Sequence, residues 1–184
     1  MIKTYNMRFQ KTHPELVIGL MDLIDHVYNI LHKKLTVIEV GSYKGESATV
    51  MLRTDKVDKI YCIDPWKAYV KKYQFIMNEV ERIFDTTFEK DVRVVKYKGT
   101  LDTFLQQISK RDIQQTSIVY IDTNLSYEEV KQDIQTARNI IRPYFVCGHD
   151  YNIEKWDDTV VKAVNECFGK PNRTFIDSSW IVRL

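Results

Sequence analysis

Residues 37–47 read Val-Ile-Glu-Val-Gly-Ser-Tyr-Lys-Gly-Glu-Ser, and this stretch decides the fold class. The apolar, β-branched run 35–41 predicts a buried strand that ends at Gly41, where the backbone must turn sharply. Gly45 stands where a helix over 46–53 is predicted to begin, a position that favours close approach to a ligand or to the sheet. A buried strand, a glycine turn and a helix in succession indicate an α/β fold.

The rest of the chain repeats this alternation of strand and helix. Strands are predicted at 59–64, 92–97, 117–122 and 144–148, helices at 15–33, 67–90 (one or two), 101–108, 126–141 and 156–168, and a closing pair of strands at 173–177 and 179–184. Each inner strand is an apolar run with little polar alternation, which is typical of a parallel sheet covered on both faces. We therefore expect an α/β, Rossmann-like three-layer sandwich with a mostly parallel seven-stranded sheet and an antiparallel C-terminal hairpin.

Composition narrows the class of protein. The 184 residues are expected to form a single domain over 1–184. The 27 basic and 25 acidic residues are intermixed, so there is no strong nucleic-acid signal. No apolar run is long enough to span a membrane, and the first residues lack the apolar core of a signal peptide. The three cysteines are far apart and odd in number, which favours free thiols and a cytoplasmic location. Oligomeric state is not readable.

The glycine loop does not fit the usual phosphate-binding patterns. Its spacing is G-x-x-x-G, so the middle glycine of a dinucleotide fingerprint is replaced by Ser42 and Tyr43. A P-loop would need Gly-Lys-Ser/Thr, whereas Glu46 follows Gly45 here. The loop therefore suits a ligand without phosphates.

Asp64 follows the second predicted strand, 19 residues after Gly45. In this fold an acidic side chain at that place accepts hydrogen bonds from ribose hydroxyls. A glycine loop with a ribose acid and no phosphate site indicates a nucleoside with a non-phosphate tail, and S-adenosylmethionine matches this description. The alternative is that Gly41 and Gly45 are ordinary turn glycines and that Asp64 is a helix cap before Pro65.

Four segments carry a family resemblance: EVGSYKGES (39–47), IDPW (63–66), YIDTNLSYEEVKQDI (120–134) and CGHDY (147–151). In this order they resemble the class I S-adenosylmethionine-dependent methyltransferases. The nearest branch is a small single-domain one with a GHDY motif, related to sugar and macrolide O-methyltransferases. The resemblance runs from about residue 16 to the C-terminus and implies S-adenosylmethionine as cofactor and methyl transfer as activity.

The resemblance also implies roles for individual residues. Glu39 would line the methionine end of the cofactor with the glycine loop, Asp64 would hold the ribose, and Trp66 would cover the ribose or the adenine. Gly99 and Thr100 would lie near the adenine, although the family more often has an acidic residue in place of Thr100. The full cofactor-binding set implied is Glu39, Gly41, Ser42, Tyr43, Gly45, Ser47, Asp64, Trp66, Gly99, Thr100 and Asp122.

Polar groups at two further strand ends form the predicted catalytic set. Asp122 ends the fourth predicted strand, and His149 and Asp150 follow the fifth. A histidine with an ordinary pKa near 6.5 suits a general base, and Asp122 or Asp150 could orient it. In the related sugar and macrolide enzymes such carboxylates bind magnesium, which implies Asp122 and Asp150 as ligands of Mg²⁺. The alternative is that Asp122 caps a turn before Ser126 and that His149 is an ordinary buried histidine.

Three departures from the family pattern lie in the substrate half. The family histidine would fall near Asn124-Leu125, where this chain has none. The family glycine just before that position is replaced by Thr123, and the family Gly-Gly before the fifth strand is replaced by Tyr144-Phe145. We predict an enzyme that methylates a small-molecule acceptor, at a hydroxyl oxygen. The alternatives are a catalytically weakened S-adenosylmethionine-binding protein with a regulatory or scaffolding role, or a methyltransferase acting on nucleic acid or protein. The aromatic, lysine-rich stretch 66–75 could form a substrate lid, but helical packing is favoured.

Overall fold

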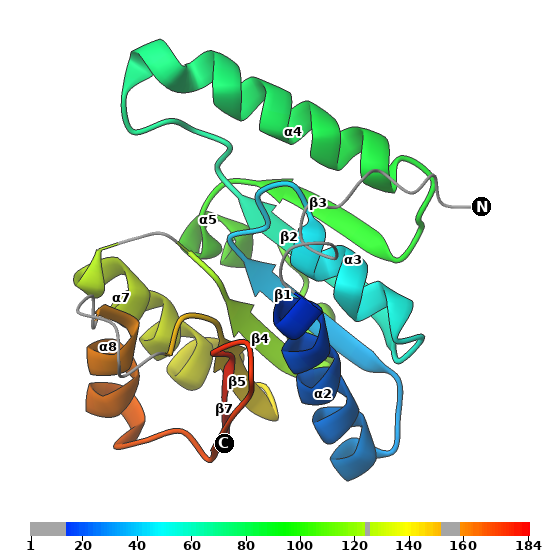
Figure 1. The fold of residues 1–184 in the computed structure, drawn as a ribbon, viewed down its shortest axis with the longest axis vertical. Helices are drawn as coiled ribbons and strands as arrows, with labels where there is room; N and C mark the ends of the chain where they lie inside the picture. Colours follow the sequence, from blue (N-terminus) through cyan, green and yellow to red (C-terminus); the bar gives the residue numbers. More distant parts are fainter. Residues whose placement is uncertain (1–13, 124–125, 152–158) are drawn as a thin grey trace.

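The computed structural model describes residues 14–123, 126–151 and 159–184, which build a sheet between two layers of helices (Figure 1). The strand order is β3-β2-β1-β4-β5-β7-β6. β7 runs antiparallel to both β5 and β6, and the pairs among β1 to β5 are parallel. The strands are β1 (Leu35–Val40), β2 (Val57–Asp64), β3 (Val94–Lys98), β4 (Ile118–Ile121), β5 (Phe145–Gly148), β6 (Arg173–Thr174) and β7 (Trp180–Arg183). The predicted fold class is confirmed.

The helices divide between the two faces of the sheet. One face packs against α2 (Pro14–Leu31), α3 (Glu46–Arg53) and α4 (Gln74–Phe88), and the other against α5 (Leu101–Leu105), α7 (Tyr127–Thr136) and α8 (Thr159–Phe168). Alternate residues of a strand therefore enter different cores: Ile118 and Tyr120 join the first, whereas Val119 and Ile121 join the second. All four residues of β4 are buried, which explains why the strand is apolar throughout.

Several element bounds differ from the predicted ones. The stretch 67–90 forms the short 3-10 helix η1 (Lys71–Tyr73) followed by α4, and 126–141 ends in the π-helix η2 (Ala137–Ile141). The helix α6 (Lys110–Gln114) was not expected, because it has five residues and little apolar periodicity; the Ser109 side chain caps it. β6 has two residues because the backbone turns at Ser178, whose φ is 67°, and the Phe175 N–H donates to the Ser179 carbonyl.

The direction of the strands decides what gathers at one edge of the sheet. The parallel strands β1, β2, β4 and β5 all end at that edge, which is where ligands bind in open α/β sheets. β7 begins there, since Trp180 pairs with Gly148 at the end of β5. The turn between β6 and β7 thus reaches the same edge. Among the described helices, none has the length and apolar character needed to cross a bilayer.

Candidate active site

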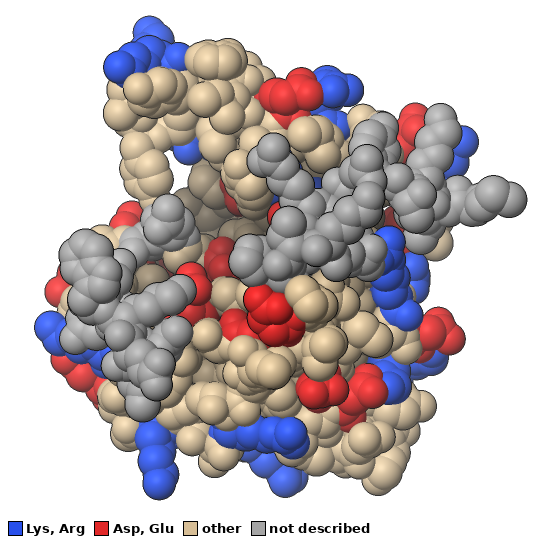
Figure 2. Space-filling model, viewed as in Figure 1, with Lys and Arg blue, Asp and Glu red and all other residues tan. Residues whose placement is uncertain are grey.

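An open cavity of about 1160 Å³ lies at the carboxyl ends of the strands. Figure 2 shows the molecule hollowed there, below the projecting start of α4. The residues of the predicted site that line the cavity are Gly41, Ser42, Tyr43, Ser47, Asp64, Gly99, Thr100, Asp122 and Asp150. The fold therefore brings together most of the residues that the sequence singled out, from five separate segments of the chain.

Gly41 fixes the loop after β1 against two neighbouring strands. Its φ is +93°, and a Cβ at this position would lie 2.0 Å from the carbonyl oxygen of Asp122. Its N–H donates to the Ile63 carbonyl at 2.8 Å. Because L-residues avoid positive φ and the neighbouring atom is backbone, glycine is required at this turn.

Gly45 serves packing and does not line the cavity. Its φ is +79°, and a Cβ there would lie 2.2 Å from Cε2 of Phe88, at the end of α4. The close approach expected of this glycine is therefore made to α4.

Glu39 lies beneath the loop and is fully buried. Its Oε1 accepts a hydrogen bond of 2.5 Å from the Ser47 hydroxyl, while Oε2 has no partner among the described residues. Burial raises the pKa of this carboxyl to about 7. Glu39 does not itself line the cavity, so the structure places it under the loop and not at the cavity wall.

Asp64 lies between two loops at the floor of the cavity. Its Oδ2 accepts from the Tyr43 N–H at 2.9 Å and its Oδ1 from the Trp66 N–H at 2.6 Å. Burial raises its pKa, and these two hydrogen bonds oppose that shift. A carboxylate has about four acceptor positions, so Asp64 can still accept from the hydroxyls of a ribose.

Trp66 does not cover the cavity, in contrast to the role implied for it. Its ring is fully buried and packs on Phe84 at 5.1 Å between centroids, with Nζ of Lys96 4.7 Å from its centroid. Its Nε1 donates to the Tyr43 carbonyl at 2.8 Å. The residue thus joins the loop after β2 to the loop after β1, and φ of 42° at Trp66 turns its ring into the core.

The wall expected at the adenine end contains acidic groups that were not predicted as site residues. Thr100 lines the cavity but caps α5 through a reciprocal capping box with Thr103. Asp102, Glu129 and Asp133 also line it, and burial raises the pKa of Asp133 to about 7. Glu129 and Asp133 are four residues apart on α7, a spacing that places them on one helix face and was readable as a signal.

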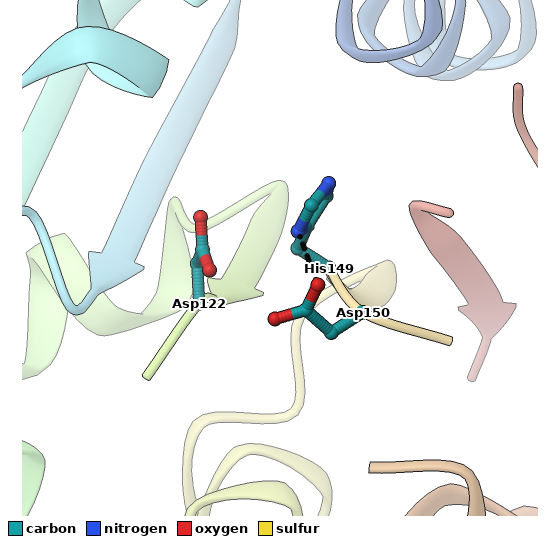
Figure 3. A group of neighbouring side chains, drawn as sticks. All are labelled: Asp122, His149 and Asp150. Carbon is teal, nitrogen blue, oxygen red and sulfur yellow. Dashed lines mark ion pairs between the residues drawn. The ribbon is translucent and has the colours of Figure 1, made fainter. Parts of the chain in front are cut away.

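Asp122, His149 and Asp150 form a cluster at the ends of β4 and β5 (Figure 3). One ligand-type atom from each lies within 4.8 Å of the others. Nδ1 of His149 is 3.1 Å from Oδ1 of Asp150. Asp150 has φ of 62° and is exposed, whereas His149 turns toward the α2 side of the sheet.

The charges in this cluster raise the pKa of His149 above the ordinary histidine value. Burial alone would lower the pKa of His149, but the hydrogen bond with Asp150 and the charges of Asp122, Asp150 and Asp177 raise it to about 9. The imidazole is therefore protonated at neutral pH and cannot accept a proton there. Burial raises the pKa of Asp122 to about 6, and the His149 cation limits that rise. Asp122 is thus the better proton acceptor of the two.

Asp177 was not recognised in the sequence, although it faces this cluster. It is buried in the turn between β6 and β7, and its carboxylate accepts from the Ser179 N–H at 3.0 Å and hydroxyl at 2.7 Å. Ser179 in turn lies 3.3 Å from the Tyr120 hydroxyl. Gly19 of α2 makes room for it, because a Cβ there would lie 2.2 Å from the Asp177 carboxylate.

The departures from the family pattern have modest local effects. Tyr144 is half exposed, with Nζ of Lys33 4.6 Å from its ring centroid, while Phe145 is a buried residue of β5. Thr123 lines the cavity. Positions 124 and 125, where the family histidine would fall, lie outside the described residues.

Residues 38–151 match the family described as a methyltransferase domain. A curated relative, the uncharacterized protein R132 of Acanthamoeba polyphaga mimivirus, is 20% identical over 146 residues, which cover 78% of this chain and 64% of that protein. The chain thus spans less than two thirds of the length of the curated relative that it matches.

Solved structures share the fold at low sequence identity. The methyltransferase domain of bacterial CtHen1 is 14% identical with a TM-score of 0.57, and the alignment covers 92% of this chain and all of that one. CalS11, a TDP-rhamnose 3'-O-methyltransferase of calicheamicin biosynthesis, is 18% identical with a TM-score of 0.53, and the alignment covers 89% of this chain and 77% of that one.

Proposed function

This chain belongs to the methyltransferase domain family, and on that premise we propose that it binds S-adenosylmethionine and methylates a hydroxyl oxygen of a small-molecule acceptor. The observation that carries the proposal is the joint position of Gly41, Asp64 and Asp122 on one cavity. One bound cofactor would then have its methionine end at Gly41, its ribose hydroxyls at the Asp64 carboxylate and its methyl group near the Asp122 carboxylate.

The residues fit this cofactor chemically. The Ser47 hydroxyl lines the cavity beside the loop that would hold the methionine end, and the buried Glu39 carboxyl accepts its hydrogen bond from below. The Ser47 oxygen can therefore accept from the ammonium group of that end. The cofactor, when bound, supplies a methyl group on a positively charged sulfur. Acidic groups around the cavity stabilise such a cation.

Asp122 is the proposed general base. The acceptor oxygen gains the methyl group, the bond between sulfur and methyl carbon breaks, and the hydroxyl proton passes to the Asp122 carboxylate. A carboxyl with a pKa of about 6 is largely ionised at neutral pH and is basic enough to take part. The protonated His149 holds Asp150 and offsets the negative charge of Asp122, so its proposed role is electrostatic.

A divalent cation also fits the cluster. Mg²⁺ prefers oxygen ligands and is often held by one or two carboxylates with several waters. Asp122 and Asp150 supply such oxygens, so we propose them as its ligands. With the ion bound, Asp122 would no longer serve as the base, and the ion would instead lower the pKa of an acceptor hydroxyl bound to it.

Two experiments test the proposed function. Titration calorimetry with S-adenosylmethionine and S-adenosylhomocysteine should detect binding of both. A labelled-methyl assay over a panel of hydroxylated metabolites, with and without Mg²⁺, should then identify turnover. Binding without turnover on any acceptor would favour the alternative of a regulatory cofactor-binding protein, and absence of binding would refute the proposal.

We propose that residues 1–184 act as one domain around this cavity, and that the protein works in the cytoplasm, where free cysteines such as Cys62 and Cys147 persist.

A further inference from the structure

The cavity is larger than one cofactor requires. Pockets that hold a drug-sized ligand measure roughly 300–1,000 Å³, and this one measures about 1160 Å³. One of its walls is the segment 67–77, which we call the lysine–tyrosine arm. Lys67, Tyr69, Val70, Tyr73 and Ile76 of the arm all line the cavity. The arm therefore has space beside the cofactor for part of a second molecule.

The arm exposes large apolar and aromatic side chains. Tyr69 is 80% exposed, Phe75 68%, Val70 50% and Tyr73 47%. Contiguous exposed apolar groups of this kind mark binding surfaces on soluble proteins. The helical packing expected for this stretch therefore applies to Trp66, which is buried, and not to the aromatic residues of the arm.

The backbone of the arm is held in place. The Gln74 side chain accepts from the Ala68 N–H at 3.0 Å and donates to the Trp66 carbonyl at 2.9 Å. The Tyr73 N–H donates to the Val70 carbonyl at 2.9 Å. Because Trp66 is itself buried, the exposed rings project from a fixed base, which reduces the entropy cost of binding a ligand.

All the charged residues of the arm are lysines. Residues 65–78 include Lys67, Lys71 and Lys72 and no acidic residue. The acids of the adjacent helix α4 are engaged elsewhere: Glu81 and Asp85 pair with Lys96, and Glu79 pairs with Arg82. Within the described parts of the chain, the three arm lysines form no ion pair. They therefore offer positive charge to a ligand.

This charge does not suit the proposed cofactor. S-adenosylmethionine carries a positive sulfur and no phosphate, so it gains nothing from neighbouring lysines. Lysines complement phosphate oxygens, and tyrosine rings stack on planar bases. Nζ of Lys72 lies 4.8 Å from the centroid of the Tyr73 ring, so cation and aromatic face are adjacent.

We propose that the lysine–tyrosine arm binds a nucleoside diphosphate group of the acceptor, with Tyr69 and Tyr73 against the base and Lys67, which lines the cavity, at the phosphates. Lys71 and Lys72 lie outside the lining and would add positive charge beside them. The methylated hydroxyl then belongs to a sugar carried on that nucleoside diphosphate. This inference rests on the proposed function, because it assigns the acceptor of the same cavity.

The test uses the full chain and begins with S-adenosylhomocysteine. Calorimetry first measures its affinity for each variant, and the saturated protein is then titrated with uridine diphosphate, pyrophosphate and a series of single-stranded oligonucleotides. Absence of S-adenosylhomocysteine binding to the unmodified protein would refute the proposed function. Normal binding without binding of uridine diphosphate would refute only the assignment of the arm.

Matched variants locate the binding. The triple charge reversal Lys67→Glu, Lys71→Glu, Lys72→Glu should weaken uridine diphosphate and pyrophosphate by about tenfold or more. The control reversal of the exposed Lys90, Lys110 and Lys170, with the same change in net charge, should leave both unchanged. Tyr69→Ala with Tyr73→Ala should weaken uridine diphosphate but not pyrophosphate. Equal effects of the two triple variants, or an affinity that rises with oligonucleotide length above that of uridine diphosphate, would overturn the proposal.

Discussion

Gly41 and Asp122 approach so closely that a Cβ on Gly41 would lie 2.0 Å from the Asp122 carbonyl oxygen. This contact sets the separation between the loop after β1 and the end of β4. The loop after β1 is proposed to hold the methionine end of the cofactor, and the end of β4 carries the proposed base Asp122. The contact at Gly41 therefore influences how the methyl group of the cofactor and the hydroxyl of the acceptor are aligned. Alignment of this kind is a large part of what methyl transfer requires.

Gly41→Ala should destabilise the protein and impair the site. The residue would have to keep φ near +93° and displace backbone, so we expect a loss of more than about 2 kcal/mol in the free energy of unfolding. Gly169→Ala is the matched control, because its φ is +80° but nothing lies within 4 Å of the added Cβ. Urea unfolding compares the two. Equal losses would show that the contact with Asp122 has no energetic weight.

Asp64→Asn should weaken S-adenosylhomocysteine binding by about 10- to 100-fold, the range expected when hydrogen bonds to a charged acceptor are lost. The amide has the shape of the carboxyl but places a donor toward either the Tyr43 or the Trp66 N–H. Asp58→Asn, at an exposed position of the same strand, is the control. Calorimetry that finds the same affinity for both variants would remove Asp64 from ribose binding.

The raised pKa of His149 predicts a pH dependence of stability. Below pH 6.5 the imidazole is protonated in both the folded and the unfolded chain, and its favourable contribution is fully present. Between pH 6.5 and about 9 only the folded chain keeps the proton, so stability falls as pH rises, by up to about 3 kcal/mol. Urea unfolding of the metal-free protein across this interval measures the slope. His149→Gln should flatten it, and an unchanged slope would contradict the assignment.

Magnesium should lower the pKa of His149. A cation on Asp122 and Asp150 offsets the negative charges that now raise this pKa. NMR titration of the imidazole, with Mg²⁺ or with a chelator, measures the shift. Asp150→Asn should abolish the Mg²⁺ effect. Asp177→Asn should lower the pKa but leave Mg²⁺ binding intact, since Asp177 does not line the cavity. A His149 pKa indifferent to Mg²⁺ would argue against this site.

Much of the fold is readable from the sequence because both faces of the sheet are buried. A strand such as β4 must then be apolar at every position, and that pattern stands out between amphipathic helices. Asp64 is readable for a related reason: its place after β2 follows from strand order alone. Short polar elements such as α6 carry no comparable signal, because capping by Ser109 and tertiary contacts decide them.

The electrostatics of the site are not readable in the same way. The pKa of His149 depends on Asp177, which reaches the cluster only through the turn between β6 and β7. Likewise, the sequence places Trp66 after the ribose acid but does not reveal that a left-handed backbone turns its ring into the core. Gly45 is similar, because its neighbour Phe88 is 43 residues further along the chain. These properties arise from contacts between distant segments.

The reversed direction of β7 has a practical consequence for handling the molecule. The strand starts at the edge that bears the cavity and runs away from it, so Leu184 lies at the amino end of β5, where its N–H donates to the Tyr144 carbonyl (Figure 1). An affinity tag, fluorophore or sensor surface joined at Leu184 would leave the crevice open to solvent. Immobilisation through that point is therefore the orientation of choice for surface-based ligand screening.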